Sequence, residues 1–151
     1  MKFTPSKLNT FLFFKLPSAY FSGVRVKSIS ENKCEVTVTH RWINQNPFKS
    51  MYFAVQAMAA EFTTGALVMY QIKKSGKKVS MLVLSNRSSF TKKATGKITF
   101  SCDEGHKIEE TIKRAFERGE GQTCRMRSLG MNQKGEQVSE FEFEWTIKVK
   151  Q

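Results

Sequence analysis

One acidic residue, Glu61, interrupts an otherwise apolar stretch and is the strongest candidate for chemistry in this chain. The stretch covers residues 51–70 and reads MYFAVQAMAAEFTTGALVMY. A carboxylate in apolar surroundings is costly to bury unless it is paired or used. Carboxylates of this kind serve as general bases or as nucleophiles. We therefore expect any chemistry of this protein to be found at Glu61.

The stretch around Glu61 is predicted to be a long buried helix. It has no Gly or Pro before Gly65, and at 1.5 Å per residue it would span roughly 30 Å. Helical spacing places Glu61 on a stripe of small neighbours, which leaves room for a ligand or for a helix from a second copy. That stripe contains Ala54, Ala57, Glu61, Gly65 and Val68. Three polar residues of another side, Tyr52, Gln56 and Thr63, are interpreted as ordinary groups with satisfied hydrogen bonds.

The start of this helix is a second candidate element. Its first backbone N–H groups, near residues 50–53, have no partner within the helix and carry the positive end of the helix dipole. Such groups attract anions or polarise a carbonyl. Glu61 lies about two turns further on, so one helix cannot bring both elements to the same atom. The helix start of a second copy could, which favours a site shared by a dimer.

The elements predicted around the helix indicate an α+β protein with a mostly antiparallel sheet. An N-terminal helix is expected within residues 6–22, at about Lys7–Lys15 and broken by Pro17. The central helix should stop around Lys73–Gly76, and a short amphipathic helix should cover 107–118 with Ile108, Ile112 and Phe116 on one side. Alternation of apolar and polar residues predicts strands at Val24–Ser30, Lys33–His40, Val79–Ser85, Lys97–Cys102, Gln122–Leu129 and Glu136–Val149. A curved sheet wrapped around one helix satisfies this order, as one domain of residues 1–151 with a core at 24–149.

Composition narrows the class of protein. The chain has 151 residues, 40% hydrophobic and 25% charged, which is typical of a globular domain. Its net charge of 25 − 13 = +12 is spread along the chain, so a solvated basic surface is the main interpretation. A phosphate-bearing ligand is the first alternative and nucleic acid the second. The polar residues of the long helix argue against a membrane span.

The cysteines and histidines predict no metal site. Cys34, Cys102 and Cys124 are widely spaced without a CxxC motif, and the chain has only two histidines. We interpret the cysteines as reduced, buried thiols of a cytoplasmic protein. No GxSxG motif is present, and a serine or cysteine hydrolase is therefore a weak alternative. No cofactor is expected.

Two segments resemble parts of the hot-dog-fold thioesterases. Residues 46–61, NPFKSMYFAVQAMAAE, are similar to the start of the central helix in those proteins, where an acidic residue follows an Asn fifteen positions later. Residues 89–100, SFTKKATGKITF, resemble their segment F-x-K/R-P-A-x-G-x-(I/V). The likeness covers about residues 24–149. It is nearest to the poorly characterised thioesterase-like branch, a domain of unknown function.

The resemblance implies a hot-dog fold, in which a long helix lies in a curved antiparallel sheet, and a homodimer or tetramer with sites between subunits. It implies hydrolysis of an acyl-CoA or an acyl-carrier-protein thioester. Glu61 would be the nucleophile or the general base, and Asn46 would orient water or substrate. The backbone N–H of Phe53 would polarise the thioester carbonyl.

At several other positions that the resemblance implies, this chain departs from the pattern of the family. Some relatives carry Thr four residues past the acid, where this chain has Gly65, and Thr64 is the nearest candidate. Arg87, Lys92 and Lys93 are expected to meet the phosphates of CoA. Lys93 replaces the usual Pro, and Phe53 stands in a helix start that is usually rich in Gly. A non-catalytic dimer that binds acyl groups or lipids is therefore kept as the alternative function.

Overall fold

The computed structural model describes residues 2–150. Along these residues, helices and strands alternate in the predicted general order. The elements are α1 (Pro5–Lys15), α2 (Pro17–Phe21), β1 (Arg25–Ile29), β2 (Cys34–Thr39), the short 3-10 helix η1 (Trp42–Asn44), α3 (Phe53–Ser75), β3 (Val79–Phe90), β4 (Lys97–Cys102), α4 (Gly105–Arg118), β5 (Gln122–Met131) and β6 (Gln137–Val149).

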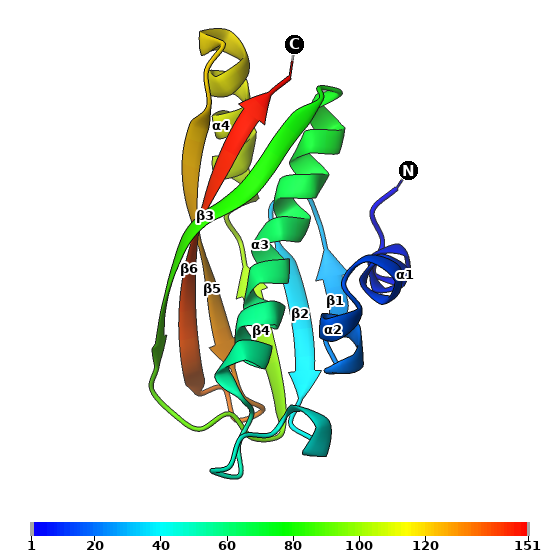
Figure 1. Ribbon diagram of the computed structural model, residues 1–151, viewed down its shortest axis with the longest axis vertical. Coiled ribbons are helices and arrows are strands. Elements are labelled where there is room, and N and C mark those ends of the chain that lie inside the picture. The colour runs from blue at the N-terminus through cyan, green and yellow to red at the C-terminus, as the bar shows by residue number, and fades with distance from the viewer. Residues whose placement is uncertain (1, 151) are drawn as a thin grey trace.

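The strands form one antiparallel sheet that curves behind α3 (Figure 1). Its strand order is β1-β2-β4-β5-β6-β3, and α3 packs against β2, β4, β5 and β6. The predicted first hairpin is present, since β1 pairs with β2 from Arg25 opposite Thr37 to Ile29 opposite Cys34. The inner face of the sheet and the buried side of α3 therefore share one apolar core.

Helix α3 ends where the sequence predicts. Gly76 follows it with a φ of 71°, a left-handed conformation that favours Gly, and Lys73 and Lys74 lie in its last turn. It starts at Phe53, two residues later than predicted, because Met51 is extended and donates its N–H to the carbonyl of Ala94. Within residues 2–150, no helix combines the length and the apolar character needed to cross a bilayer.

The N-terminal helix of the prediction is two helices. Pro17 has no N–H to continue α1, so α1 ends at Lys15 and α2 begins at Pro17 itself. Helix α1 lies beside β1 (Figure 1), and the side chain of Asn9 bonds to both the N–H and the carbonyl of Val26. This amide occupies the outer edge of β1 as a neighbouring strand would.

Strand β3 is longer than predicted and forms the other edge of the sheet. It continues past Ser85 to Phe90, because it pairs with β6 until Phe90 stands opposite Ser139. Residues 84–90 are exposed on both faces. Apolar side chains on this edge include Leu82, which is 67% exposed, and Leu84, which is 55% exposed. No strand among residues 2–150 covers the outer edge of β3.

Strand β6 confirms its predicted alternation, while α4 corrects one detail. Phe141, Phe143, Trp145 and Ile147 are buried on the inner face. On α4, Ile108 and Ile112 are buried as expected, whereas Phe116 is 57% exposed. Ala115 takes the inner position, and the ring of Phe116 lies under Nζ of Lys77 at 3.8 Å from its centroid.

Candidate functional site at the central helix

Glu61 lies in a small apolar cavity beside the N-terminal helices. The cavity, called here the carboxylate cavity, has a volume of about 180 Å³. Its lining comes from α1, α3, β3, β6 and the residue that joins α1 to α2, and includes Phe11, Leu16, Phe62, Met81 and Trp145. No hydrogen bond or ion pair joins the Glu61 side chain to any residue in 2–150. The structure therefore keeps this carboxylate free for a ligand or for chemistry.

Burial changes the acidity of this carboxyl group. Because the charged form loses hydration in the apolar cavity, the pKa of Glu61 rises from 4.5 to about 7. The group is then close to half ionised near neutral pH, which suits a general base. The exposed Lys15 also lines the cavity, without forming an ion pair with Glu61.

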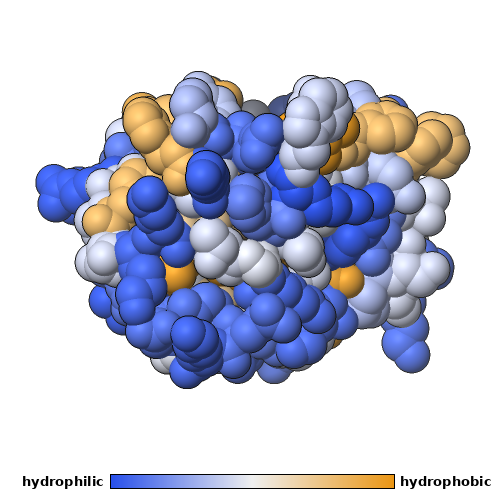
Figure 2. Space-filling model, turned by 90° about the horizontal axis from the view of Figure 1, so that it is seen from below, coloured by the Kyte–Doolittle hydropathy of each residue, from blue (hydrophilic) through white to orange (hydrophobic). Residues whose placement is uncertain are grey.

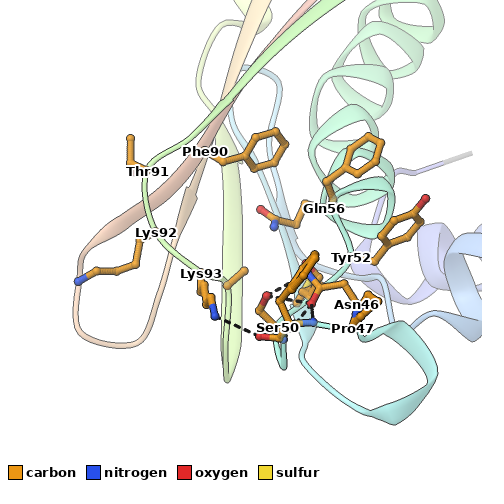
Figure 3. Close-up of a pocket in the computed structure, with 13 residues that line it drawn as sticks. Asn46, Pro47, Ser50, Tyr52, Gln56, Phe90, Thr91, Lys92 and Lys93 are labelled. Carbon is orange, nitrogen blue, oxygen red and sulfur yellow. Dashed lines mark hydrogen bonds between the residues drawn. The ribbon is translucent and has the colours of Figure 1, made fainter.

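A larger pocket of about 580 Å³ lies at the start of α3 (Figure 3). We call it the helix-start pocket, and its lining consists of Asn46, Pro47, Phe48, Ser50, Met51, Tyr52, Phe53, Gln56 and the run Phe90–Ala94. Seen from below, this end of the protein is mostly hydrophilic, with hydrophobic groups gathered at the upper left and right (Figure 2). The exposed aromatic residues here include Phe48, Tyr52 and Phe53, which are 69%, 48% and 54% exposed. Exposed rings around a pocket are typical of a binding surface.

The predicted residue Asn46 holds the turn that leads into α3. Its Oδ1 accepts from the N–H of Phe48 at 2.8 Å, and its Nδ2 donates to Oγ of Ser50 at 2.9 Å and to the carbonyl of Met51 at 3.2 Å. The side chain still lines the helix-start pocket. In this structure the Asn46 amide is therefore used within the turn, at the edge of the pocket.

The two segments that carry the family resemblance meet at this turn. The N–H of Met51 donates to the carbonyl of Ala94 at 2.9 Å, and Nζ of Lys93 donates to the carbonyl of Phe48 at 3.2 Å. Figure 3 shows Lys93 directed at the turn. Segments far apart in the sequence thus build one wall of the helix-start pocket together.

Phe53, the residue predicted to bind the carbonyl through its backbone N–H, occupies the first position of α3. Within residues 2–150, no group accepts a hydrogen bond from the backbone N–H of Phe53 or Ala54. Glu61 follows eight residues later on the same helix, about 12 Å along the axis. The carboxylate and the free N–H groups of one chain therefore lie in two separate cavities.

Thr64 is buried in a local hydrogen-bond network. Its hydroxyl donates to the carbonyl of Glu61 at 2.9 Å and accepts from Nε1 of Trp145 at 3.0 Å. The neighbouring Thr63 is also satisfied, through the carbonyl of Ala60 and Oγ of Ser128. The contacts of Thr64 hold the Trp145 ring against the helix, next to Glu61.

The three basic residues predicted to bind CoA phosphates lie in different places. Lys92 and Lys93 line the helix-start pocket, whereas Arg87 lies on β3 and does not. Figure 3 shows Lys92 pointing away from the pocket, and its ammonium pairs with Glu136. Both partners of that pair are exposed, so the ion pair is weak.

Gln56 is the residue of this region that the sequence interpretation misjudged. Its side chain is only 4% exposed and lines the helix-start pocket (Figure 3), yet Oε1 has no hydrogen-bond donor among residues 2–150. A buried amide oxygen without a donor is unfavourable unless a ligand or water supplies one. In the sequence, Gln56 is marked only by being a polar residue in the apolar stretch, one and a half turns before Glu61.

Other chemistry is poorly supported by the described residues. Burial raises the pKa of Cys34 and Cys102 to about 12 and also raises that of Cys124, so these thiols are protonated and unreactive at neutral pH. Within residues 2–150, no cluster of three His, Cys, Asp or Glu side chains could hold a metal ion.

Solved structures share this architecture along nearly their whole length. A protein from Pseudomonas aeruginosa described as a probable thioesterase has a TM-score of 0.80 at 20% identity, with 97% of each chain covered. A protein of unknown function from Chlorobaculum tepidum has a TM-score of 0.82 at 16% identity, with 96% of each chain covered. The thioesterase HI1161 from Haemophilus influenzae has a TM-score of 0.75 at 12% identity, with 99% of this chain and 93% of that chain covered. At these identities the likeness shows the fold.

The predicted hot-dog fold is confirmed by this likeness and by the sheet that curves around α3. Among curated proteins, no sequence matches this chain. The family described as a domain of unknown function (DUF4442) matches residues 7–147, which is nearly all of the chain. The chain therefore belongs to the DUF4442 domain family, a thioesterase-like branch of the hot-dog fold.

Proposed function

We propose that this protein is a homodimeric acyl-thioester hydrolase acting on acyl-CoA or acyl-carrier-protein substrates. The observation that carries the proposal is the half-buried Glu61 carboxylate, which has no hydrogen-bond or ion-pair partner among residues 2–150 and a pKa of about 7. The thioesterase-like fold of the family supports the same reaction class.

In the proposed reaction, Glu61 removes a proton from a water molecule. The water oxygen forms a bond to the thioester carbon while negative charge develops on the carbonyl oxygen. The C–S bond then breaks, and the proton held by Glu61 passes to the departing thiolate. The products are a carboxylic acid and a thiol. Because the base must be ionised, we expect kcat/KM to rise with pH around 7.

The negative charge on the carbonyl oxygen needs hydrogen-bond donors, which we assign to the start of α3. The free N–H of Phe53 has the right character, but in its own chain it lies about 12 Å from Glu61 along the helix. In a two-fold dimer, the N–H of Phe53 in one chain could face Glu61 of the other. The uncovered edge of β3, with Leu82 and Leu84 exposed, supports a contact with a second copy.

Complementation between two inactive variants tests the shared site. Glu61→Gln removes the base. Phe53→Pro removes the backbone N–H together with the aromatic ring, so Phe53→Ala, which removes the ring and keeps the N–H, is its control. Pro fits the first position of a helix after the extended Tyr52, whose ψ is 136°. Glu61→Gln and Phe53→Pro should each be inactive alone. A refolded equal mixture should regain about a quarter of wild-type turnover, because half of the dimers then contain one intact site.

The complementation experiment has two informative failures. Turnover that survives in Glu61→Gln alone would end the mechanistic claim. If both variants are inactive and mixing restores no turnover, the shared site is refuted. The Glu61 carboxylate and the Phe53 N–H would then act within one chain or belong to different sites. Sedimentation of each variant and of the mixture should give the same oligomeric state, which excludes loss of assembly as the cause.

The second candidate function is a dimer that binds acyl groups without hydrolysing them. The observation that favours it is the side chain of Phe53, which is 54% exposed in the helix-start pocket. Its ring meets the ring of Phe90 edge-on, with 6.3 Å between the ring centroids. This ring stands where related enzymes carry Gly. Retention of an acyl-CoA without release of free thiol would select this function over hydrolysis.

The predicted contacts of Lys92, Lys93 and Arg87 with CoA phosphates remain part of the proposal. So do the roles assigned to Asn46 and Thr64, the possible tetramer and the cytoplasmic location. Lys93 is the best placed of the three, because it lines the helix-start pocket and is directed at its turn, whereas Lys92 points away from the pocket.

A further inference from the structure

The carboxylate cavity combines a single acidic group with a largely apolar wall. Beyond Glu61, the lining of α3 consists of Phe62, Gly65 and Met69, and Met81 and Trp145 face them from the sheet. Such a cavity suits a ligand that carries a hydrocarbon tail next to a polar, reactive group. Lys15 is the other charged residue of the lining, and it is exposed to solvent.

Gly65 leaves a gap between the carboxylate and the indole ring. A methyl group on its Cα would lie 3.4 Å from Oε1 of Glu61 and 3.4 Å from Cζ2 of Trp145. Gly65 lies in the interior of α3 and does not have a positive φ, so the backbone does not require Gly here. Alanine would be the better helix former. What Gly provides at this position is the space beside Glu61.

We propose that the carboxylate cavity binds the acyl chain of the substrate and limits it to about six to eight carbons, with Gly65, Met69 and Met81 determining the limit. An apolar cavity of about 150 Å³ accommodates benzene, which has six carbons. The cavity here, at about 180 Å³, is slightly larger. This inference rests on the proposed function and specifies its substrate class as thioesters of short to medium chains.

Chain-length selectivity can be measured without turnover. S-alkyl-CoA thioethers cannot be hydrolysed and can be made with butyl, hexyl, octyl, dodecyl and hexadecyl chains. The chain has two Trp residues, and Trp42 is 82% exposed, so Trp42→Phe leaves Trp145 as the only indole reporter inside the cavity. In that background, affinity should rise about fourfold for each added methylene up to the octyl chain and stop rising beyond it.

Two variants should move the limit in opposite directions. Gly65→Ala fills the gap, so affinity for the octyl ligand should fall at least about tenfold while thermal stability is kept or increased. Met69→Ala removes about three non-hydrogen atoms from the wall, so the dodecyl ligand should gain at least about fivefold relative to the octyl ligand. Met131→Ala, on β5 and outside this cavity, is the matched control and should leave the profile unchanged.

The outcomes separate this inference from the proposed hydrolysis. Octyl-selective binding that Gly65→Ala abolishes, in a protein that hydrolyses no thioester, would support the acyl cavity and refute the hydrolase. Hydrolysis with equal rates for butyryl, octanoyl and palmitoyl thioesters would support the hydrolase and overturn the acyl cavity. The acyl cavity would also be overturned if neither Gly65→Ala nor Met69→Ala changed how affinity depends on chain length.

Discussion

Replacing Glu61 by Gln should make the protein more stable at alkaline pH and leave its stability unchanged at acidic pH. In the folded protein, burial raises the pKa of Glu61 from 4.5 to about 7. Between these two pH values the folded state retains a proton that the unfolded chain has released. Protonated Glu61 therefore contributes its full stabilisation below pH 4.5, and this contribution is lost as pH rises through about 7.

The size of this effect follows from the same two values. Their difference is 7 − 4.5 = 2.5 pH units, and each unit corresponds to about 1.4 kcal/mol. Ionised Glu61 should thus lower the free energy of unfolding by about 3–4 kcal/mol above pH 8. Glutamine has the size of protonated glutamate and cannot ionise, so Glu61→Gln should recover that amount at high pH and almost none near pH 4.

Urea unfolding of the wild type and of Glu61→Gln at fixed protein concentration would measure this difference at about pH 4 and pH 8.5. Glu110→Gln, which removes an exposed carboxylate from α4, controls for the change in net charge. A Glu61→Gln effect of the same size at both pH values would refute the reasoning, because it would mean that the carboxylate is hydrated in the folded protein.

Three further outcomes are expected from single substitutions. Gln56→Met replaces a buried amide whose oxygen lacks a donor, so thermal denaturation should show a free energy of unfolding higher by about 1–3 kcal/mol. If this amide contacts the substrate, steady-state kinetics of the same variant should show a lower kcat/KM. Thr64→Val leaves the buried N–H of Trp145 without its acceptor and should lower stability by about 1–3 kcal/mol. If Thr64 also takes part in catalysis, as proposed, turnover per folded molecule falls as well, and retained turnover would refute that role. Lys92→Ala breaks an exposed pair with Glu136 and should change stability by less than about 1 kcal/mol. If Lys92 binds phosphate, the same variant raises KM for an acyl-CoA and not for an acyl-N-acetylcysteamine thioester.

The elements that the sequence predicts well are those whose burial is periodic. In β2, Cys34, Val36 and Val38 are buried as their alternation indicates, because one face of that strand meets the core. In contrast, the second half of β3 has no such pattern. Residues 84–90 are exposed on both faces, so only pairing with β6 keeps them extended. That pairing depends on a strand far along the chain and leaves no local signal.

The site shows the same division between local and distant information. Glu61 is conspicuous in the sequence because its neighbours on the helix are apolar. The state of the other polar groups depends on residues that are distant in sequence. Thr63 is satisfied by the carbonyl of Ala60 and by Oγ of Ser128, whereas Oε1 of Gln56 finds no donor among residues 2–150 although the two side chains belong to the same helix. Helical periodicity alone gives both residues the same interpretation.

The position of β3 in the sheet has a consequence for how the protein folds. Strand β3 follows α3 directly in the chain, but its partner is β6, so that Val79 stands opposite Val149. During synthesis, β3 must remain without its ladder until the last strand has emerged from the ribosome. Contacts between such distant residues slow folding, and an unpaired strand with exposed leucines invites association with other nascent chains. Closing the β3–β6 ladder should thus be a late step, at which folding competes with aggregation.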